Sequence, residues 1–297
     1  MGFLSRFFGK GSLEEGKKKF SLGYIPKEDA QMNWAMEKAR LTLWYFEAQL
    51  KRPAPGQDYF SIKVMVKDQD QVEHLWLTAP DFDEEGNLYG KVGNEPVQVK
   101  SIKLGQDIGI GRALISDWMI VEQGVLLGGY TIRAIRDRLP EMEKQFFDES
   151  IGIGIDAGAD HFVPDFNTPE GAITALEEAY INEDLSAAVS CKDFYEEARL
   201  LLAHLDLKTT DESFIQETSE ALEAAFIEGL TSYGMPDLSQ IKRAFSKREQ
   251  VSENSVIVTE VCTFPNGLVT EQRLLTFKTR EGWKVIGVIK ENIASSS

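Results

Sequence analysis

The 297-residue chain has few of the residues that build metal sites and disulfide frameworks. It contains two cysteines, Cys191 and Cys262, and three histidines, His74, His161 and His204. Two cysteines are too few for the disulfide framework of a secreted protein, so the reducing cytoplasm is the expected compartment. The histidines lie far apart in the sequence, and no Cys-x-x-Cys or His-Glu-x-x-His spacing occurs, which argues against zinc. We therefore expect no metal site and no cofactor.

Long apolar runs are also absent. No stretch approaches the roughly eighteen apolar residues that a membrane helix requires, and the first residues lack the apolar core and cleavage site of an export signal. Residues 1–24 mix Phe and Leu with Arg and Lys, which is typical of a flexible or amphipathic terminal segment without stable membrane insertion.

Positive charge is scarce in one part of the chain. Lys and Arg number 32 against 48 Asp and Glu, which gives a formal net charge of −16. Residues 151–237 carry 3 basic and 19 acidic side chains, a net charge equal to that of the whole protein. A field of this sign repels nucleic acid and attracts basic proteins. Helix faces that are acidic only for solubility are the simpler alternative.

The first half of the chain has the pattern of one helix followed by strands. Apolar residues at helical spacing predict a helix from Lys27 to Leu50, which ends before the Pro-rich turn at 53–56. Strands are then predicted near 60–66, 72–77, 88–92, 108–110, 118–121 and 125–135. Because short polar turns separate them, we expect a helix packed on an antiparallel sheet and no parallel dinucleotide-binding sheet.

The second half begins after residues 140–167, where Gly and Pro interrupt the pattern. Asn167 or Thr168 can cap a helix that has Pro169 in its first turn. Helices are predicted near 169–181, 184–205 and 211–232, and strands near 239–249, 254–264, 268–278 and 282–291. The fold class is therefore α+β in both halves. We expect a terminal segment (1–24), a first domain (25–147), a Gly/Pro linker (148–167) and an acidic second domain (168–293).

Four separated blocks in the first half closely resemble the bacterial YegJ-like family, domain of unknown function 2314. The blocks are Glu73-His74-Leu75-Trp76, Gly90-Lys91-Val92-Gly93-Asn94-Glu95-Pro96, Ile115-Ser116-Asp117-Trp118-Met119 and Gly128-Gly129-Tyr130-Thr131. The resemblance spans about residues 27–140 and implies a fold unit without an established activity. We expect Trp76 and Trp118 to be core residues. Asn94, Glu95, Ser116 and Asp117 lie at strand ends, where they form hydrogen-bonded turns or a small binding groove.

Residues 168–291 look like the nuclear transport factor 2-like fold, a cone of curved sheet around helices. The resemblance rests on residues 169–173 and 179–184 at its start and on 273–278 and 282–286 at its end. It implies no single function, because this fold hosts enzymes, ligand binders and partner-binding modules.

An enzyme would need an ionisable group inside the cone, and no such constellation stands out. Tyr195, His204 and Trp283 are the candidates for lining an interior pocket, which leaves a small-molecule binder, a hydrolase or an isomerase as the alternative function. Cys191 and Cys262 show no activating neighbours in the sequence. We therefore assign no catalytic residue.

The acidic segment and the missing catalytic constellation together favour a non-catalytic bacterial protein-binding module. The most concrete form is an immunity-type or antitoxin-like protein that captures a basic partner, such as a toxin, on an acidic helical surface. The sequence leaves the oligomeric state open. The expected contact residues are Glu177, Glu178, Glu183, Asp184, Glu196, Glu197, Glu217, Glu220 and Glu228.

Overall fold

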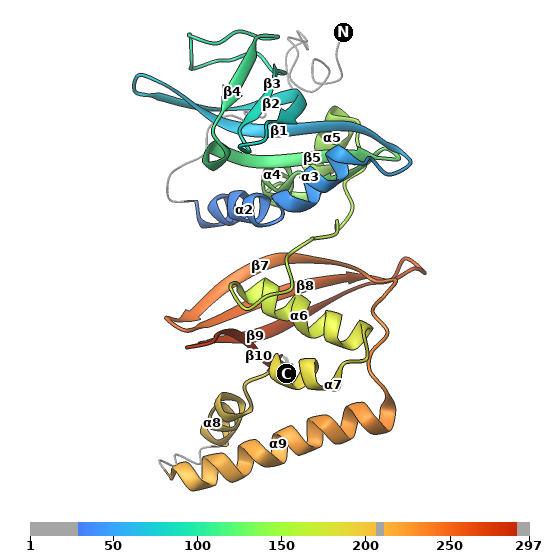
Figure 1. The fold of residues 1–297 in the computed structure, drawn as a ribbon. Helices are drawn as coiled ribbons and strands as arrows, with labels where there is room; N and C mark the ends of the chain where they lie inside the picture. Colours follow the sequence, from blue (N-terminus) through green and yellow to red (C-terminus); the bar gives the residue numbers. More distant parts are fainter. Residues whose placement is uncertain (1–28, 206–210, 290–297) are drawn as a thin grey trace. The chain divides into compact units, whose positions relative to one another are not determined.

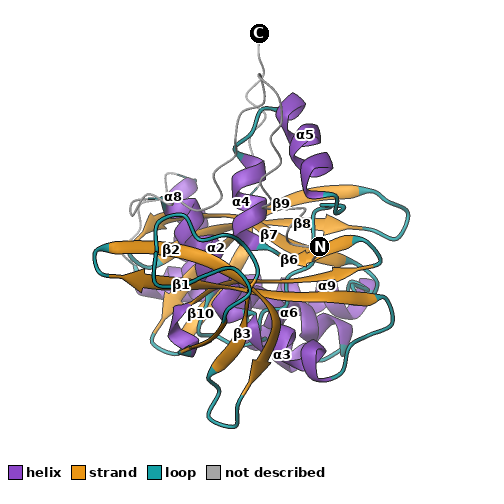
Figure 2. Ribbon diagram, turned by 90° about the horizontal axis from the view of Figure 1, so that it is seen from above, coloured by secondary structure: helices purple, strands orange, loops and turns teal. Residues whose placement is uncertain are grey.

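The computed structural model describes residues 29–205 and 211–289. The chain divides into two compact units, Met1–Ala159 and Asp160–Ser297. Each unit combines helices with one antiparallel sheet (Figure 1 and Figure 2), so the protein is α+β, as predicted. Among the described residues, no helix has the length and apolar character needed to cross a membrane.

The first unit contains a six-stranded sheet in the order β4-β3-β2-β1-β5-β6. Its strands are β1 (Gln57–Asp68), β2 (Gln71–Phe82), β3 (Leu88–Val92), β4 (Asp107–Ile110), β5 (Ile115–Glu122) and β6 (Val125–Gly128), with a short 3-10 helix at Arg112–Leu114. Its helices are α2 (Ala30–Leu41), α3 (Leu43–Lys51), α4 (Tyr130–Asp137) and α5 (Glu141–Ile151). Both faces of the sheet are covered, because separate apolar clusters lie on its two sides.

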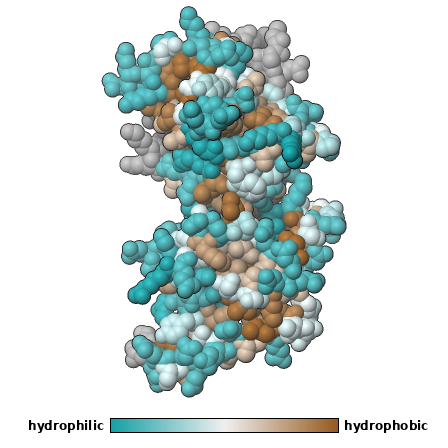
Figure 3. Space-filling view, in the orientation of Figure 1, coloured by the Kyte–Doolittle hydropathy of each residue, from teal (hydrophilic) through white to brown (hydrophobic). Residues whose placement is uncertain are grey.

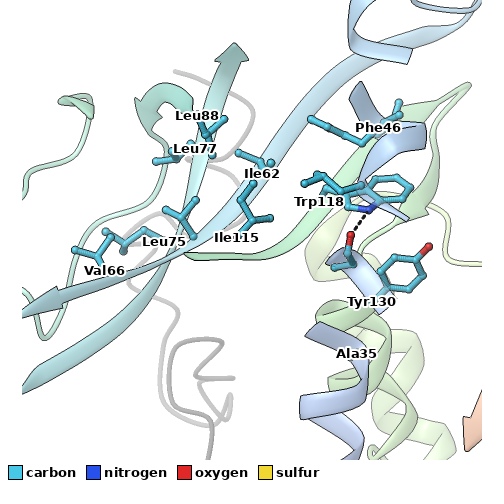
Figure 4. Close-up of a cluster of buried hydrophobic side chains, with 14 of the residues drawn as sticks. Ala35, Phe46, Ile62, Val66, Leu75, Leu77, Leu88, Ile115, Trp118 and Tyr130 are labelled. Atoms are coloured by element: carbon cyan, nitrogen blue, oxygen red, sulfur yellow. Dashed lines mark hydrogen bonds between the residues drawn. The ribbon is translucent and has the colours of Figure 1, made fainter. Parts of the chain in front are cut away.

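The larger of these clusters packs α2 and α3 against β1, β2 and β5 (Figure 4). Phe46, Trp118 and Tyr130 meet at its centre, and the indole of Trp118 donates to the carbonyl of Ala39 at 3.1 Å. Trp76 belongs to the second cluster, with residues of β5, β6, α4 and α5. The prediction that Trp76 and Trp118 are core residues is confirmed, since they are 1% and 0% exposed.

The helix predicted from Lys27 to Leu50 is two helices in the described residues. The chain breaks at Thr42, whose hydroxyl donates to the carbonyl of Lys38 at 2.8 Å and accepts from the indole of Trp118 at 3.1 Å. A threonine that competes in this way for helix carbonyls bends the chain. The bend sets both helices against the same tryptophan.

The strand predicted at 125–135 is wrong beyond Gly128. Gly128 and Gly129 both have positive φ angles, of 66° and 62°, and a Cβ on Gly128 would lie 2.5 Å from atoms of Trp118. The backbone turns sharply there, a conformation that favours glycine, and α4 begins at Tyr130. The strand prediction extended too far because the apolar residues of α4 also fit the pattern of a strand.

The interruption predicted at 140–167 also contains a helix. Pro140 immediately precedes α5, and Gly152 ends it in a left-handed conformation. Phe147 and Ile151 of α5 are buried, whereas Met142 and Phe146 on its other side are 81% and 65% exposed.

The second unit contains a four-stranded meander in the order β10-β9-β8-β7. Its strands are β7 (Lys242–Ser252), β8 (Ser255–Thr263), β9 (Val269–Thr279) and β10 (Gly282–Val288), and its helices are α6 (Pro169–Ile181), α7 (Leu185–Ser190), α8 (Phe194–His204) and α9 (Glu212–Tyr233). The sheet is open. Helix α6 packs on the sheet, and α9 lies beyond α7 and α8 (Figure 1). The nuclear transport factor 2-like fold stays a prediction.

The helix predicted at 184–205 is divided into α7 and α8. Asp184 and Asp193 each accept a backbone N–H at 2.9 Å, from Ala187 and Glu196, so each begins a helix of its own. The intervening Lys192 forms a bridge with Val285 of β10. A second N-cap inside an apolar periodic run therefore marks a break that periodicity alone does not reveal.

Candidate functional site

The helices of the second unit carry most of the predicted partner-binding carboxylates on their exposed surface. Two groups are present, one around the turn between α6 and α7 and one along α9. The exposed residues are Glu178, Glu183, Asp184, Glu217, Glu220 and Glu228. Asp184 also has the capping role described above, so part of its charge is directed at the backbone of α7.

The expectation of an exposed side chain is wrong for Glu177 and Glu196, which are 7% and 6% exposed. Glu196 binds the guanidinium of Arg199 through both carboxylate oxygens, at 2.8 and 2.5 Å. Glu197 is half-buried, and its Oε2 lies 3.0 Å from Nζ of Lys192. These three carboxylates are occupied within the unit, so six of the nine predicted contact residues are exposed.

Glu177 forms a buried acidic pair with Glu260 of β8. Burial, followed by the hydrogen bond to Glu260 and its charge, raises the pKa of Glu177 well above the ordinary value, against the opposing charge of Arg243. Arg243 lies 3.0 Å from Glu177, and Gln272 donates to Oε2 of Glu260 at 2.5 Å. Within the described residues, Oε1 of Glu260 is buried without a hydrogen-bond partner. Glu177 therefore holds its proton more tightly than an ordinary glutamate does, because burial and the neighbouring carboxyl of Glu260 both disfavour its charged form.

A buried ion pair lies one heptad earlier on the same helix. Glu170 is fully buried and accepts from Nε and Nη2 of Arg248 at 2.8 and 2.6 Å. Glu170 and Glu177 lie on the same face of α6, because residues seven apart are two helical turns apart. They pair with Arg248 and Arg243 of the single strand β7. Two Glu–Arg pairs therefore fix α6 to the sheet, and only Glu177 of these two glutamates was among the predicted contact residues.

Helix α9 has an unusually exposed surface. Of its 22 residues only Ile215 and Ser219 are buried. Phe214 and Tyr233 are 43% and 93% exposed, and the apolar residues between them, apart from Ile215, are half-buried or exposed. Hydrophobic atoms are visible at the surface between α7 and α9 (Figure 3). The acidic side chains of α9 thus stand beside exposed apolar ones.

Of the three residues expected to line an interior pocket, Tyr195 alone lines the surface depression described here. Tyr195 lies at a surface depression of about 570 Å³, whose lining does not include His204 or Trp283. His204 is exposed at the end of α8, and Trp283 lies beside Nζ of Lys278 at 6.0 Å. The cations at the depression are Lys192, Arg280 and Lys284, and the anions are Asp193, Glu223 and Glu281. Equal numbers of each sign select no charge class of ligand.

The four residues predicted to form either turns or a binding groove in the first unit differ in their exposure and in their hydrogen bonds. Asn94 accepts the backbone N–H of Trp76 at 2.8 Å, and Glu95 is exposed. Ser116 and Asp117 are buried. The neighbouring loop is fixed by Glu73, a buried carboxylate that accepts the backbone N–H groups of residues 97–99 at 2.8 to 3.1 Å. These contacts are those of hydrogen-bonded turns.

Asp117 instead belongs to a buried charge centre that the sequence pattern does not indicate. Its carboxylate accepts from the backbone of Trp118, Tyr130 and Thr131 and from the Thr131 hydroxyl at 2.6 Å, so it caps α4 from across the sheet. Lys63 of β1, 1% exposed, donates to the same hydroxyl at 3.2 Å and lies over the ring of Trp76. Strand alternation places Lys63 opposite the main core, but α4 and α5 cover that face too.

The surroundings of Lys63 disfavour its charge. Burial lowers the pKa of Lys63 from 10.5 to about 8, although the carboxylate of Asp117 opposes the shift. Burial, together with the charge of Lys63, also lowers the pKa of His74 to about 4. His74 is hydrogen-bonded through Nδ1 to the hydroxyl of Ser116 at 2.8 Å. The centre therefore links β1, β2, β5 and α4 through groups with displaced proton affinities.

A stability measurement tests this shift. Between about pH 8 and 10.5 the unfolded chain retains the Lys63 proton while the folded chain loses it, so the free energy of unfolding rises with pH by about 2–3 kcal/mol from this residue. Urea unfolding of the wild type and of Lys63→Met across this range measures the effect. The free energy of unfolding of the wild type should rise relative to that of the variant as pH rises. If the two proteins show the same dependence of unfolding free energy on pH, Lys63 has an ordinary pKa in the folded chain.

Comparison with known proteins gives a match in the first unit. Residues 29–155 match the family model described as an uncharacterized protein conserved in bacteria, DUF2314. The uncharacterized protein YegJ of Escherichia coli K12 is 32% identical over 138 residues, which are 46% of this chain and 86% of YegJ. No solved structure matches the chain.

A longer match extends into the second unit. A putative ankyrin repeat protein of Neisseria meningitidis serogroup B is 27% identical over 236 residues, which are 75% of this chain and 88% of that protein. Because 236 residues exceed the length of either compact unit, this similarity includes parts of both. The combination of a first unit with at least part of the second is therefore present in another bacterial protein.

Proposed function

The chain belongs to the DUF2314 family of uncharacterised bacterial proteins, and we propose that it is a non-catalytic cytoplasmic module that binds a basic protein partner on the acidic helices of its second unit. The family model ends at residue 155, whereas the acidic segment begins at 151 and continues to 237. The proposed activity therefore lies almost entirely in the part of the chain that follows the family domain.

The exposure of α9 is the observation that supports this function. A helix of 22 residues with two buried positions contributes little to the core of its own unit, since helix stability in proteins comes mainly from packing of one face. Its exposed glutamates, Glu217, Glu220 and Glu228, have no basic side chain within ion-pair distance among the described residues. Their charge is thus available to a visiting cation.

An immunity-type or antitoxin-like role is the most concrete form of the proposal. Toxins that act on nucleic acid need basic surfaces, because phosphate contacts supply most of their binding energy. An acidic protein captures such a partner quickly, since complementary charge raises association rates by about ten- to a thousandfold at low salt. The chain as a whole, with its net charge of −16, adds to the same steering.

Charge reversal on α9 tests the proposal. We expect the variant with Glu217→Lys, Glu220→Lys and Glu228→Lys to bind a fluorescent 18-residue leucine–lysine peptide with an association rate at least about tenfold lower at low ionic strength. The difference should shrink as salt is added, because exposed charges are screened. Stopped-flow fluorescence with the full chain measures both rates.

A matched variant separates position from net charge. Asp70, Glu84 and Glu149 are exposed carboxylates of the first unit, and their replacement by lysine changes the net charge by the same amount. This control should keep most of the wild-type rate. If both variants are slowed equally, the effect belongs to total charge and the acidic helices are not the binding surface.

A further inference from the structure

Helix α5 presents an apolar pair to solvent on the side opposite its packed face. Met142 and Phe146 are 81% and 65% exposed, whereas Phe147 and Ile151 are buried in the second apolar cluster of the first unit. At about 100° per residue, Met142 and Phe146 lie about 40° apart around the helix and at least about 100° from the two buried residues. The pair therefore forms an apolar face of its own.

The exposed face of α5 is also acidic. The helix contains four acidic residues and one lysine, and this lysine, Lys144, is paired with Glu141 at 3.0 Å. Glu149 is exposed two helical turns after Met142 and about 20° from it around the helix axis. A segment that covers Met142 and Phe146 therefore meets a carboxylate beside them.

The described part of the chain begins close to this helix. The carboxylate of Asp29 accepts from both Nη atoms of Arg138, and Oε1 of Gln31 accepts from Nε of the same arginine at 3.0 Å. Arg138 follows the last residue of α4, and α5 begins three residues later, at Glu141. Because three residues span at most about 11 Å, Asp29 is held near the first turn of α5.

The residues that precede Asp29 match the exposed face of α5 in polarity and in charge. They lie outside the described residues, and their sequence has four apolar and two basic side chains within residues 3–10. Residues 1–24 contain five Lys or Arg against two Glu, so their net charge is opposite in sign to that of α5. The 20 residues between Phe8 and Asp29 extend to at most about 70 Å, whereas α5 is about 16 Å long.

We propose that residues 3–10 dock on the exposed face of α5 in the same chain, with Phe7 and Phe8 covering Met142 and Phe146. A basic side chain of the segment then lies near Glu149. The occupant belongs to the same chain because its tether begins beside α5, and a tethered segment has an effective concentration of about millimolar. A second copy of α5 would instead bring like charges together across a symmetric interface. The inference concerns the first unit and is independent of the proposed function.

Disulfide trapping in the full chain tests the contact. Gln145 is exposed on α5 about 60° from Met142, and Ser101 is exposed in the loop between β3 and β4. The two native cysteines are buried and do not compete. We expect Ser5→Cys with Gln145→Cys to form an intramolecular disulfide at least about tenfold faster than Ser5→Cys with Ser101→Cys, because docking raises the local concentration of one thiol above that of the tether alone.

Removing the apolar side chains on either side of the contact should remove this preference. Phe7→Ser with Phe8→Ser should slow trapping at position 145 by about tenfold or more, since burial of one phenylalanine favours a contact by at least about tenfold. Met142→Ser with Phe146→Ser should have the same effect. Hydrogen exchange in chains without added cysteines should be faster at residues 141–151 in the variant with Phe7→Ser and Phe8→Ser than in the wild type.

A matched pair of substitutions in the second unit is the control. Leu268 and Val269 are 54% and 52% exposed, so Leu268→Ser with Val269→Ser removes a comparable apolar pair from the surface. This variant should keep the wild-type rate of trapping. An equal slowing by this control would show that the substitutions act through general loss of apolar surface, and the inference would be wrong.

Three further results would overturn the inference. Equal trapping rates at positions 145 and 101 would show that the segment does not prefer α5. Faster trapping of Ser5→Cys by Glu220→Cys than by Gln145→Cys would place the segment on the acidic helix α9. Disulfide-linked dimers whose yield rises with protein concentration would identify a second copy as the occupant.

Discussion

Replacing Glu170 by glutamine should lower the free energy of unfolding of the second unit by about 3–5 kcal/mol, because it removes the buried negative charge that the half-buried guanidinium of Arg248 binds. The same substitution at Glu177 should cost less than about 1 kcal/mol at neutral pH. Glutamine resembles the protonated form of Glu177 in size and charge, and it can still donate to Glu260. Two glutamates that pair with arginines of the same strand thus differ in their expected effects.

Chemical denaturation with hydrogen exchange over α6 and β7 measures this contrast in the full chain. Glu217→Gln, an exposed control on α9, should change stability by no more than about 0.5 kcal/mol. The pH dependence gives an additional check. The folded chain holds the Glu177 proton above the ordinary pKa of 4.5, so this stabilisation is present at low pH and is lost as pH rises through the raised pKa. Glu177→Gln should remove that slope, and equal losses at both positions would contradict a protonated Glu177.

Replacing Asp117 by alanine should destabilise the first unit by about 3–5 kcal/mol. The fully buried Lys63 then loses the carboxylate that favours its charged form, and the first backbone N–H groups of α4 lose their cap. Urea unfolding followed by tryptophan fluorescence reports on this unit, since Trp118 lies next to Asp117. Asp117→Asn should cost less, because an amide oxygen still accepts hydrogen bonds from α4.

A double-mutant cycle shows whether Lys63 and Asp117 act as a pair. In the background of Lys63→Met, Asp117→Ala should cost at least about 1 kcal/mol less than in the wild type, because no buried charge remains to be compensated. Additive losses would mean that Asp117 acts only as a helix cap. The comparison is informative at neutral pH, below the pKa of about 8 of Lys63, where its charged form predominates.

The succession of elements in the second unit could be predicted because local signals agree with the fold. The prediction for α6 matches its observed bounds, since Thr168 caps it and Pro169 occupies its first turn. The errors arise where a tertiary contact decides the backbone. Thr42 bends the first helix because Trp118, 76 positions later, donates to it. Gly128 turns out of the sheet because that same tryptophan leaves no room for a side chain.

The acidic surface was predictable from composition, but its exact membership was not. Glu177 and Glu178 are adjacent in sequence, yet one is buried beside Arg243 and the other is exposed. Helical geometry separates their directions by about 100°, and only the position of the sheet decides which direction is inward. Lys63 was missed for a similar reason, since its strand is covered on both faces by helices whose packing the alternating pattern does not encode.

The two sheets differ in the order in which their strands become available. In the second unit every strand pairs with the next one along the chain. Each hairpin can therefore form as soon as its second strand has been synthesised. In the first unit the central strand β1 pairs with β5, whose residues follow 51 positions later for Val64 with Ile115 and 65 for Gln57 with Glu122. Closing such a loop costs conformational entropy before the contacts between the two strands provide any favourable free energy. A nascent chain therefore holds β1 with one open edge until β5 leaves the ribosome.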